Sequence, residues 1–248
     1  MNVRSLIFFM CFLLVSGSIG LGQEPKLLSG TGVSPAVWGV LKTPSTPGPH
    51  PGVVILHGSV GWRPAYAEYA KRLADSGFVA LAINYFAETG RDTAWGQSMH
   101  MWLDWQAAIG SAAEYLRSLP SVSPDRLGLI GFSRGAFLAI SVASTIPGVK
   151  AVVDFYGGIN TSTNSLENQV RNFPPLLIFH GDADTIVPIQ FAYVLLDAVI
   201  KAGGDVEMHI YPGAQHAFNA TSSPGYDGAA TSDSNRRTIE FLRRCLSN

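Results

Sequence analysis

The sequence predicts an α/β fold with one mostly parallel central sheet, helices on both faces, and little or no lid. Short unbroken runs of aliphatic residues alternate along the chain with longer segments of helical periodicity. Such continuous apolar runs are typical of strands that are buried on both faces. The chain has 248 residues, of which 47% are hydrophobic, and this is enough material for one large core. In a sheet of this kind, the ligand site lies at the carboxyl ends of the strands.

Apolar runs, helical spacing and the glycines and prolines between them predict the elements. The prolines from Pro44 to Pro51 indicate an exposed connection after a first edge strand, because proline donates no hydrogen bond to a ladder. Residues 84–93 are expected to form a loop over the site, and residues 157–172 a second loop. Strands are predicted at residues 36–41, 53–56, 78–83, 127–130, 149–156, 176–179 and 206–211, and helices at residues 64–76, 95–119 or 99–119, 136–140, 189–202 and 232–246.

The first 22 residues have the pattern of a secretory signal peptide. Arg4 gives a basic start, residues 6–15 form an apolar stretch too short to span a bilayer comfortably, and small residues precede cleavage positions after Gly20 or Gly22. An uncleaved anchor is the alternative. Cleavage leaves Cys245 as the only cysteine, so no intrachain disulfide can form. We therefore expect a secreted or periplasmic protein in which residues 23–248 form one domain.

Charge excludes several classes of partner. The formal net charge is −1, and the basic residues do not gather into a run. A nucleic acid is therefore a poor candidate, and so is a membrane surface once the signal is removed. A small-molecule substrate is expected, bound by a monomer or a homodimer.

The segment from Gly131 to Gly135 is the strongest motif in the chain. It reads Gly-x-Ser-x-Gly and lies between the strand predicted at residues 127–130 and the helix that follows. In such a turn the strand and the helix pass so close together that only very small residues fit two positions either side of the serine. Ser133 is therefore predicted to be an exposed nucleophile.

A serine nucleophile needs a base and an acid, and two later loops offer them. Asp182 and Asp184 follow the strand at residues 176–179, and His216 follows the last predicted strand. An imidazole takes the proton from serine, and a carboxylate fixes its tautomer and stabilises its charged form. We prefer Asp184 as the acid, because Asp182 directly follows a glycine and is placed to bond local turn N–H groups.

The oxyanion formed on attack needs aligned backbone N–H donors. One is expected from Arg134, the residue after the nucleophile. The other is expected from the loop after residues 53–56, where Ser59 is the first choice and Val60 the second. His57 in this loop is expected to hold the loop by hydrogen bonding.

With these segments assembled, the chain resembles the dienelactone hydrolase family of the α/β-hydrolase superfamily. The resemblance runs from about residue 36 to the end of the chain. It rests on four motifs in the right order and spacing, at Val53–Gly61, Gly131–Gly135, His180–Pro188 and Tyr211–Phe218. The family implies a hydrolase without cofactor or metal, with its nucleophile, acid and base at Ser133, Asp184 and His216.

Two departures from the family pattern affect the expected substrate. Family members use cysteine at the nucleophile turn, whereas this chain has Ser133, which implies ordinary ester hydrolysis. They also carry a glutamate and an arginine where this chain has Gly58 and Glu88, so dienelactone is a doubtful substrate. The aromatic residues in or beside the site loops are the candidates for the substrate pocket: Trp62, Tyr85, Phe86, Trp95, Tyr156 and Phe218.

The sequence therefore predicts an exported serine hydrolase that cleaves carboxylic esters of a small molecule through an acyl-enzyme. A polysaccharide-acetyl esterase or a serine peptidase on the same scaffold is the alternative, since fold and triad do not fix the acyl or leaving group. A hydrolase-like binding protein without catalysis is the non-enzymatic alternative.

Overall fold

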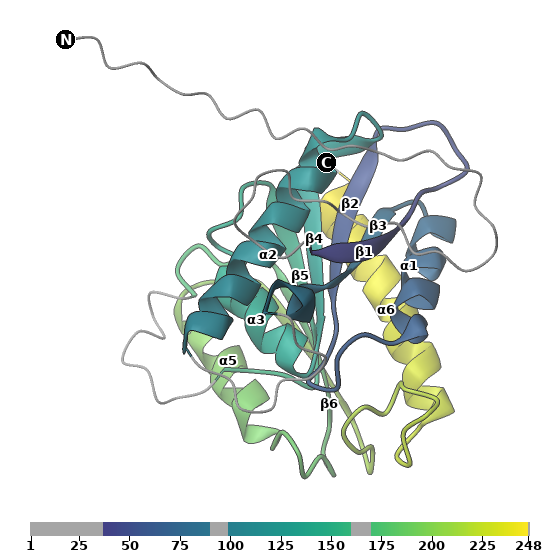
Figure 1. Cartoon of the computed structure of the whole chain (residues 1–248). Coiled ribbons are helices and arrows are strands. Elements are labelled where there is room, and N and C mark those ends of the chain that lie inside the picture. Colours follow the sequence, from purple (N-terminus) through teal and green to yellow (C-terminus); the bar gives the residue numbers. More distant parts are fainter. Residues whose placement is uncertain (1–36, 90–98, 160–169, 248) are drawn as a thin grey trace.

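The computed structural model describes residues 37–89, 99–159 and 170–247 (Figure 1). The expected signal at residues 1–22 and the pocket candidate Trp95 lie outside this part of the chain, and so does most of the expected loop at 157–172. In the described part, no helix is both long and apolar enough to cross a bilayer.

The described strands form one seven-stranded sheet in the order β1-β3-β2-β4-β5-β6-β7. β1 runs antiparallel to β3, and every other neighbouring pair is parallel. The fold is therefore the predicted α/β class. The strands are β1 (Trp38–Lys42), β2 (His50–Leu56), β3 (Val79–Asn84), β4 (Val122–Phe132), β5 (Val149–Phe155), β6 (Leu176–Gly181) and β7 (Val206–Tyr211).

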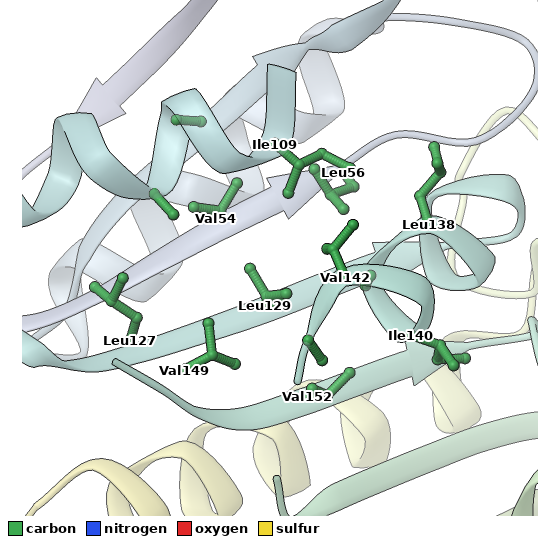
Figure 2. Close-up of a cluster of buried hydrophobic side chains, with 14 of the residues drawn as sticks. Val54, Leu56, Ile109, Leu127, Leu129, Leu138, Ile140, Val142, Val149 and Val152 are labelled. Carbon is green, nitrogen blue, oxygen red and sulfur yellow. The ribbon is translucent and has the colours of Figure 1, made fainter. Parts of the chain in front are cut away.

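Helices cover both faces of the sheet (Figure 1). α2, α3 and α5 pack on one face, and α1 and α6 pack on the other. Figure 2 shows part of the first face, where aliphatic side chains of β2, β4 and β5 meet those of α2 and α3. Burial of these apolar side chains is the main stabilising contribution to the fold. The helices are α1 (Pro64–Asp75), α2 (Met99–Ser118), α3 (Arg134–Val142), α5 (Gln190–Lys201) and α6 (Gly228–Leu246), with a 3-10 helix, η1, at Tyr85–Thr89.

Two strands begin earlier than the sequence predicts. β2 begins at His50 and contains Pro51, although this stretch was expected to be an exposed connection. The pairing of β2 with β4 shifts register between His50 and Gly52, and such an irregularity accommodates a residue that cannot donate to the ladder. β4 likewise begins at Val122 instead of residue 127.

Two further corrections concern η1 and α6. In the expected loop at residues 84–93, Asn84 is the last residue of β3 and the helical turn η1 follows it, with Tyr85 and Phe86 fully buried. α6 begins at Gly228, four residues before the predicted start. Asp227 caps it, because its Oδ1 accepts the N–H groups of Ala229 and Ala230, both at 2.9 Å.

Candidate functional site

Ser133 lies at the turn between β4 and α3, in a strained backbone conformation. Its φ is +53° and its ψ is −119°, which non-glycine residues rarely adopt. A Cβ on Gly131 would lie 2.3 Å from the Cα of Ala136, and one on Gly135 would lie 2.4 Å from the carbonyl oxygen of Leu56. Both neighbours must therefore be glycine, as the sequence predicts, and the tight turn leaves the serine hydroxyl partly exposed.

The loops after β6 and β7 bring Asp184 and His216 to Ser133. The hydroxyl of Ser133 lies 3.0 Å from Nε2 of His216, and Nδ1 of His216 lies 2.7 Å from Oδ2 of Asp184. A neutral imidazole with its proton on Nδ1 donates to Asp184 and accepts from Ser133. The hydroxyl, imidazole and carboxylate thus form the hydrogen-bonded series that the sequence predicts.

Hydrogen bonds from several directions fix the carboxylate of Asp184. Its Oδ1 accepts the backbone N–H groups of Ile186 at 2.8 Å and Val187 at 2.9 Å, and the side chain has no exposed surface. Burial alone would raise the pKa of Asp184, but contacts with His180 and His216 and the Val187 N–H outweigh it. The pKa of Asp184 is therefore held well below its ordinary value, and the group is ionised at neutral pH.

Asp182 does not contact His216 but ties the two loops together. Its Oδ1 accepts the N–H of Gly213 at 2.6 Å, and the N–H of Ala183 donates to the carbonyl of Ala214 at 3.1 Å. The His216 loop is thus held against the Asp184 loop. Asp182 was expected to bond N–H groups of its own turn, but the N–H that it accepts belongs to the loop after β7.

His57 is part of the core beneath the loop after β2. It is buried, stacks on Tyr85 with ring centroids 4.1 Å apart, and bonds Gly58 O through Nδ1 at 2.9 Å and Asn84 through Nε2 at 3.1 Å. Burial, the largest effect, lowers the pKa of His57 to about 4, so the ring is neutral at neutral pH. The phenol of Tyr85 donates to the carbonyl of His57 at 2.7 Å. These contacts hold the loop that carries Ser59.

A side-chain bond joins the two segments expected to form the oxyanion hole. Nε of Arg134 donates to Oγ of Ser59 at 3.0 Å, which links the nucleophile turn to the loop after β2. The sequence predicts a role only for the backbone N–H groups of these residues. The structure adds that their side chains hold the two segments together.

A cavity of about 600 Å³ opens at Ser133 and His216. Aromatic side chains of Tyr66, Tyr69, Phe132 and Tyr156 form much of its wall, and the exposed apolar residues Val60 and Ile186 also line it. The basic residues Arg63 and Arg134 line it as well. A volume of this size suits a small molecule.

Of the described pocket candidates, only Tyr156 lines this cavity. Its backbone φ is +44°. Its ring packs edge-on against the His216 ring, with centroids 4.8 Å apart, and its hydroxyl donates to Oδ1 of Asn219 at 2.8 Å. The expectation is wrong for the others, because each packs in or against the protein core. These are Trp62, which packs against Trp38 and Tyr66, the buried Tyr85 and Phe86, and the buried Phe218.

The side chain of Glu88 is outside the described part. Gly58 lies close to the nucleophile, since a Cβ there would be 3.5 Å from the Cβ of Ser133. In the described segments, no group of three or more histidine, cysteine, aspartate or glutamate side chains is placed to hold a metal ion.

Sequence reasoning did not find two buried residues behind Asp184. His180 is the penultimate residue of β6, and its Nε2 lies 3.5 Å from Oδ2 of Asp184. Asp154 lies fully buried near the end of β5. A signal was present in both cases, because each is an ionisable residue inside or at the end of an otherwise apolar run.

Comparison with known sequences identifies the family. The family model of the dienelactone hydrolase family matches residues 37–246. A carboxymethylenebutenolidase from Pseudomonas putida is 29% identical over 211 residues, which cover 78% of this chain and 86% of the relative. A putative carboxymethylenebutenolidase from Synechocystis is 27% identical over 227 residues, covering 83% of this chain and 90% of the relative.

Solved structures agree with the fold. A putative dienelactone hydrolase from Klebsiella pneumoniae superposes with a TM-score of 0.73 at 20% identity, over 84% of this chain and 93% of that chain. The dienelactone hydrolase-like promiscuous phosphotriesterase P91 from metagenomic libraries gives a TM-score of 0.72 at 23% identity. The superposition covers 85% of this chain and 93% of that chain. The protein is therefore a carboxylic ester hydrolase that belongs to the dienelactone hydrolase family.

Proposed function

We propose that this hydrolase uses Ser133 as nucleophile, His216 as general base and Asp184 as the acid that orients His216. The observation that carries the proposal is the pair of short contacts at His216, 3.0 Å to the Ser133 hydroxyl and 2.7 Å to Asp184. This geometry is the one that a base must have toward its nucleophile and its orienting carboxylate.

In the proposed reaction, Oγ of Ser133 attacks the ester carbonyl while its proton moves to Nε2 of His216. The oxyanion accepts hydrogen bonds from the backbone N–H groups of Arg134 and Ser59. When the intermediate collapses, the C–O bond to the alcohol breaks and the alcohol leaves with the proton from His216. Water then attacks the acyl-enzyme with His216 as base, and the acid is released from Ser133.

The cavity favours esters of small molecules with an apolar group. Its aromatic wall of Tyr66, Tyr69, Phe132 and Tyr156 lies beside Ser133 and suits an aryl or short aliphatic group. Dienelactone is not the substrate that we propose, because Gly58 stands where the family resemblance implies a glutamate. Acetylated sugars and peptides are the alternative substrates, since the fold alone does not fix the acyl group.

Replacing Ser133 with alanine tests the nucleophile. The Ser133→Ala variant is expected to lose hydrolysis of p-nitrophenyl butyrate by about 10⁴- to 10⁶-fold in kcat. Ser141→Ala is the matched control, because Ser141 bonds Gln106 on the far side of α3 and should keep wild-type turnover. A fluorophosphonate probe should label the wild-type chain and not Ser133→Ala. Retained turnover and labelling in Ser133→Ala would remove the assignment.

We further propose that the protein is exported, with cleavage after Gly20 or Gly22. The support is the basic start, apolar stretch and small residues of the first 22 positions. The full chain should be recovered outside the cytoplasm with an N-terminus at Leu21 or Gln23. An intact Met1 on the recovered protein would contradict cleavage.

A further inference from the structure

Behind Asp184 lies a second buried pair of an acid and an imidazole, Asp154 and His180. Asp154 lies on β5 and His180 on the neighbouring strand β6, and neither residue has exposed surface. Asp154 pairs in register with Ile178, two residues before His180. Since side chains two residues apart share a face of a strand, Asp154 and His180 lie on the same face of the sheet.

His180 contacts the Asp184 turn at two points. Its Nε2 lies 2.9 Å from the carbonyl oxygen of Val187 and 3.5 Å from Oδ2 of Asp184. The N–H of Val187 in turn donates to Oδ1 of Asp184 at 2.9 Å. His180, Val187 and Asp184 therefore form a closed ring of polar contacts. The Oδ2 atom that His180 approaches is the one that receives Nδ1–H of His216.

Asp154 stands on the other side of His180. Its Oδ1 accepts the N–H of Gly157 at 2.7 Å. Its Oδ2 and the Nδ1 of His180 are both buried without a hydrogen-bond partner in the described part of the chain. The two atoms do not bond each other, so Asp154 acts on His180 through its charge.

The charge states of the pair follow from burial and from each other. Burial, the largest effect, raises the pKa of Asp154 to about 7, against the opposing effects of His180 and the Gly157 N–H. Burial alone would lower the pKa of His180, but Asp184, the Val187 carbonyl and Asp154 outweigh it and raise it. Asp154 from β5 and Asp184 from the loop after β6 are the ionisable groups that act on His180 among the described residues.

We propose that His180 and Asp154 are positioning residues, which set the geometry and effective charge of Asp184 through the series Asp154, His180, Asp184, His216, Ser133. This inference rests on the proposed function of the last three residues. His180 fixes the turn at Val187 from behind, and Asp154 favours a proton on His180.

The proposal predicts the direction of a pH effect. A proton on His180 offsets part of the Asp184 charge that otherwise favours a protonated His216. Without that offset the full negative charge of Asp184 acts on the base, and a protonated base cannot accept the serine proton. Removing His180 should therefore move the acid limb of the kcat/KM profile to higher pH.

The test compares His180→Gln, Asp154→Asn and His209→Gln in the full protein. His209 lies on the next strand, β7, where it stacks on Phe179, so it is a matched control outside the series. The acid limb should move up by about half a pH unit in His180→Gln and less in Asp154→Asn. Turnover of His180→Gln should also fall by about 10- to 100-fold, since a misplaced acid misaligns the base. His209→Gln should keep the wild-type limb and rate.

A second measurement does not depend on turnover. The strongly downfield proton resonance of the hydrogen bond between His216 Nδ1 and Asp184 should shift or broaden in His180→Gln and stay unchanged in His209→Gln. If His180→Gln keeps both the wild-type acid limb and the wild-type resonance, the inference is wrong. If Ser133→Ala retains activity while His180→Gln alters the resonance, the proposed function fails and the positioning of Asp184 by His180 stands.

Discussion

The middle of the sheet and its carboxyl end contain different types of buried side chain. In the middle of the sheet, residues such as Val54 and Leu129 are aliphatic and fully buried. At the carboxyl end lie all the buried histidine and aspartate side chains of the described residues: His57, Asp154, His180 and Asp184. Ser133, Tyr156 and Ala217, three of the four non-glycine residues with positive φ in the described part, lie there too.

This difference shows that the stability and the chemistry of the protein are separated along the strands. Burial of aliphatic side chains in the middle of the sheet stabilises the fold. This stabilisation offsets the cost of the buried charges and strained backbone at the carboxyl end. Substitutions at the carboxyl end are therefore expected to change turnover where they touch the proposed catalytic residues, and the free energy of unfolding where they touch a tight turn or a buried charge.

The largest expected effect is on turnover, in Asp184→Asn. An amide presents its oxygen or its NH₂ to His216 without a charge, so the imidazole loses its orienting partner. We expect kcat for p-nitrophenyl butyrate to fall by about 10⁴-fold, as in other triads. Asp182→Asn is the control, because asparagine keeps the Oδ1 that accepts the Gly213 N–H. An equal loss in Asp182→Asn alone would transfer the acid role to that residue.

The next largest effect is on stability, in Gly131→Ala. The added Cβ would meet the Ala136 backbone at 2.3 Å, and backbone cannot rotate away as a side chain can. We expect the free energy of unfolding in urea to fall by about 3–5 kcal/mol. Gly110→Ala in α2 is the control. Nothing lies within 4 Å of its added Cβ, and we expect a gain of about 0.5–1 kcal/mol.

These two variants test whether Gly131 is required because the backbones of β4 and α3 approach each other closely there. Similar unfolding energies for Gly131→Ala and Gly110→Ala would show that strand β4 and helix α3 can separate without loss.

The smallest effect is a pH-dependent gain in stability, in Asp154→Asn. Burial raises the pKa of Asp154 to about 7 in the folded protein, above the ordinary value of an unfolded chain. The folded state thus binds this proton more tightly than the unfolded chain does. The stabilisation that the bound proton contributes is lost as the pH rises from about 4 to about 7. Asparagine cannot ionise, so the variant should be more stable than wild type by about 1–3 kcal/mol at pH 8, and similar at pH 4.

Unfolding curves in urea at both pH values measure this difference. Asp197→Asn is the control, because Asp197 is exposed and pairs with Lys201 on the surface. A gain that is equal at pH 4 and pH 8 would show that Asp154 is not charged in the folded protein at the higher pH.

Most of the fold was predictable because its signals are local. The buried strands are continuous aliphatic runs, and Gly77 and Pro120 mark the ends of two helices. β7 has the predicted bounds, and α1 begins at the predicted Pro64. The start of α6 was missed, because its first residues from Gly228 onward are small or polar and carry no apolar periodicity.

The members of the candidate site were predictable where their position after a predicted strand places them at the carboxyl edge of the sheet. Ser133, Asp184 and His216 each follow a strand, and parallel strands bring such loops to one edge. The cavity wall was not predictable, because it depends on which face of α1 turns toward the site. Tyr66 and Tyr69 line the cavity from that helix, whereas Tyr85 and Phe86 turn inward to pack on His57 and Trp105.

The bond between Tyr156 and Asn219 bears on how the protein should be produced. Asn219, Ala220 and Thr221 form an acceptor sequence for N-linked sugar, and Asn219 lines the cavity beside the nucleophile. A carbohydrate chain attached to this amide would break its contact with the phenol and fill the cavity mouth. Preparation in a bacterial host, which leaves the amide unmodified, keeps the entrance open for any ester.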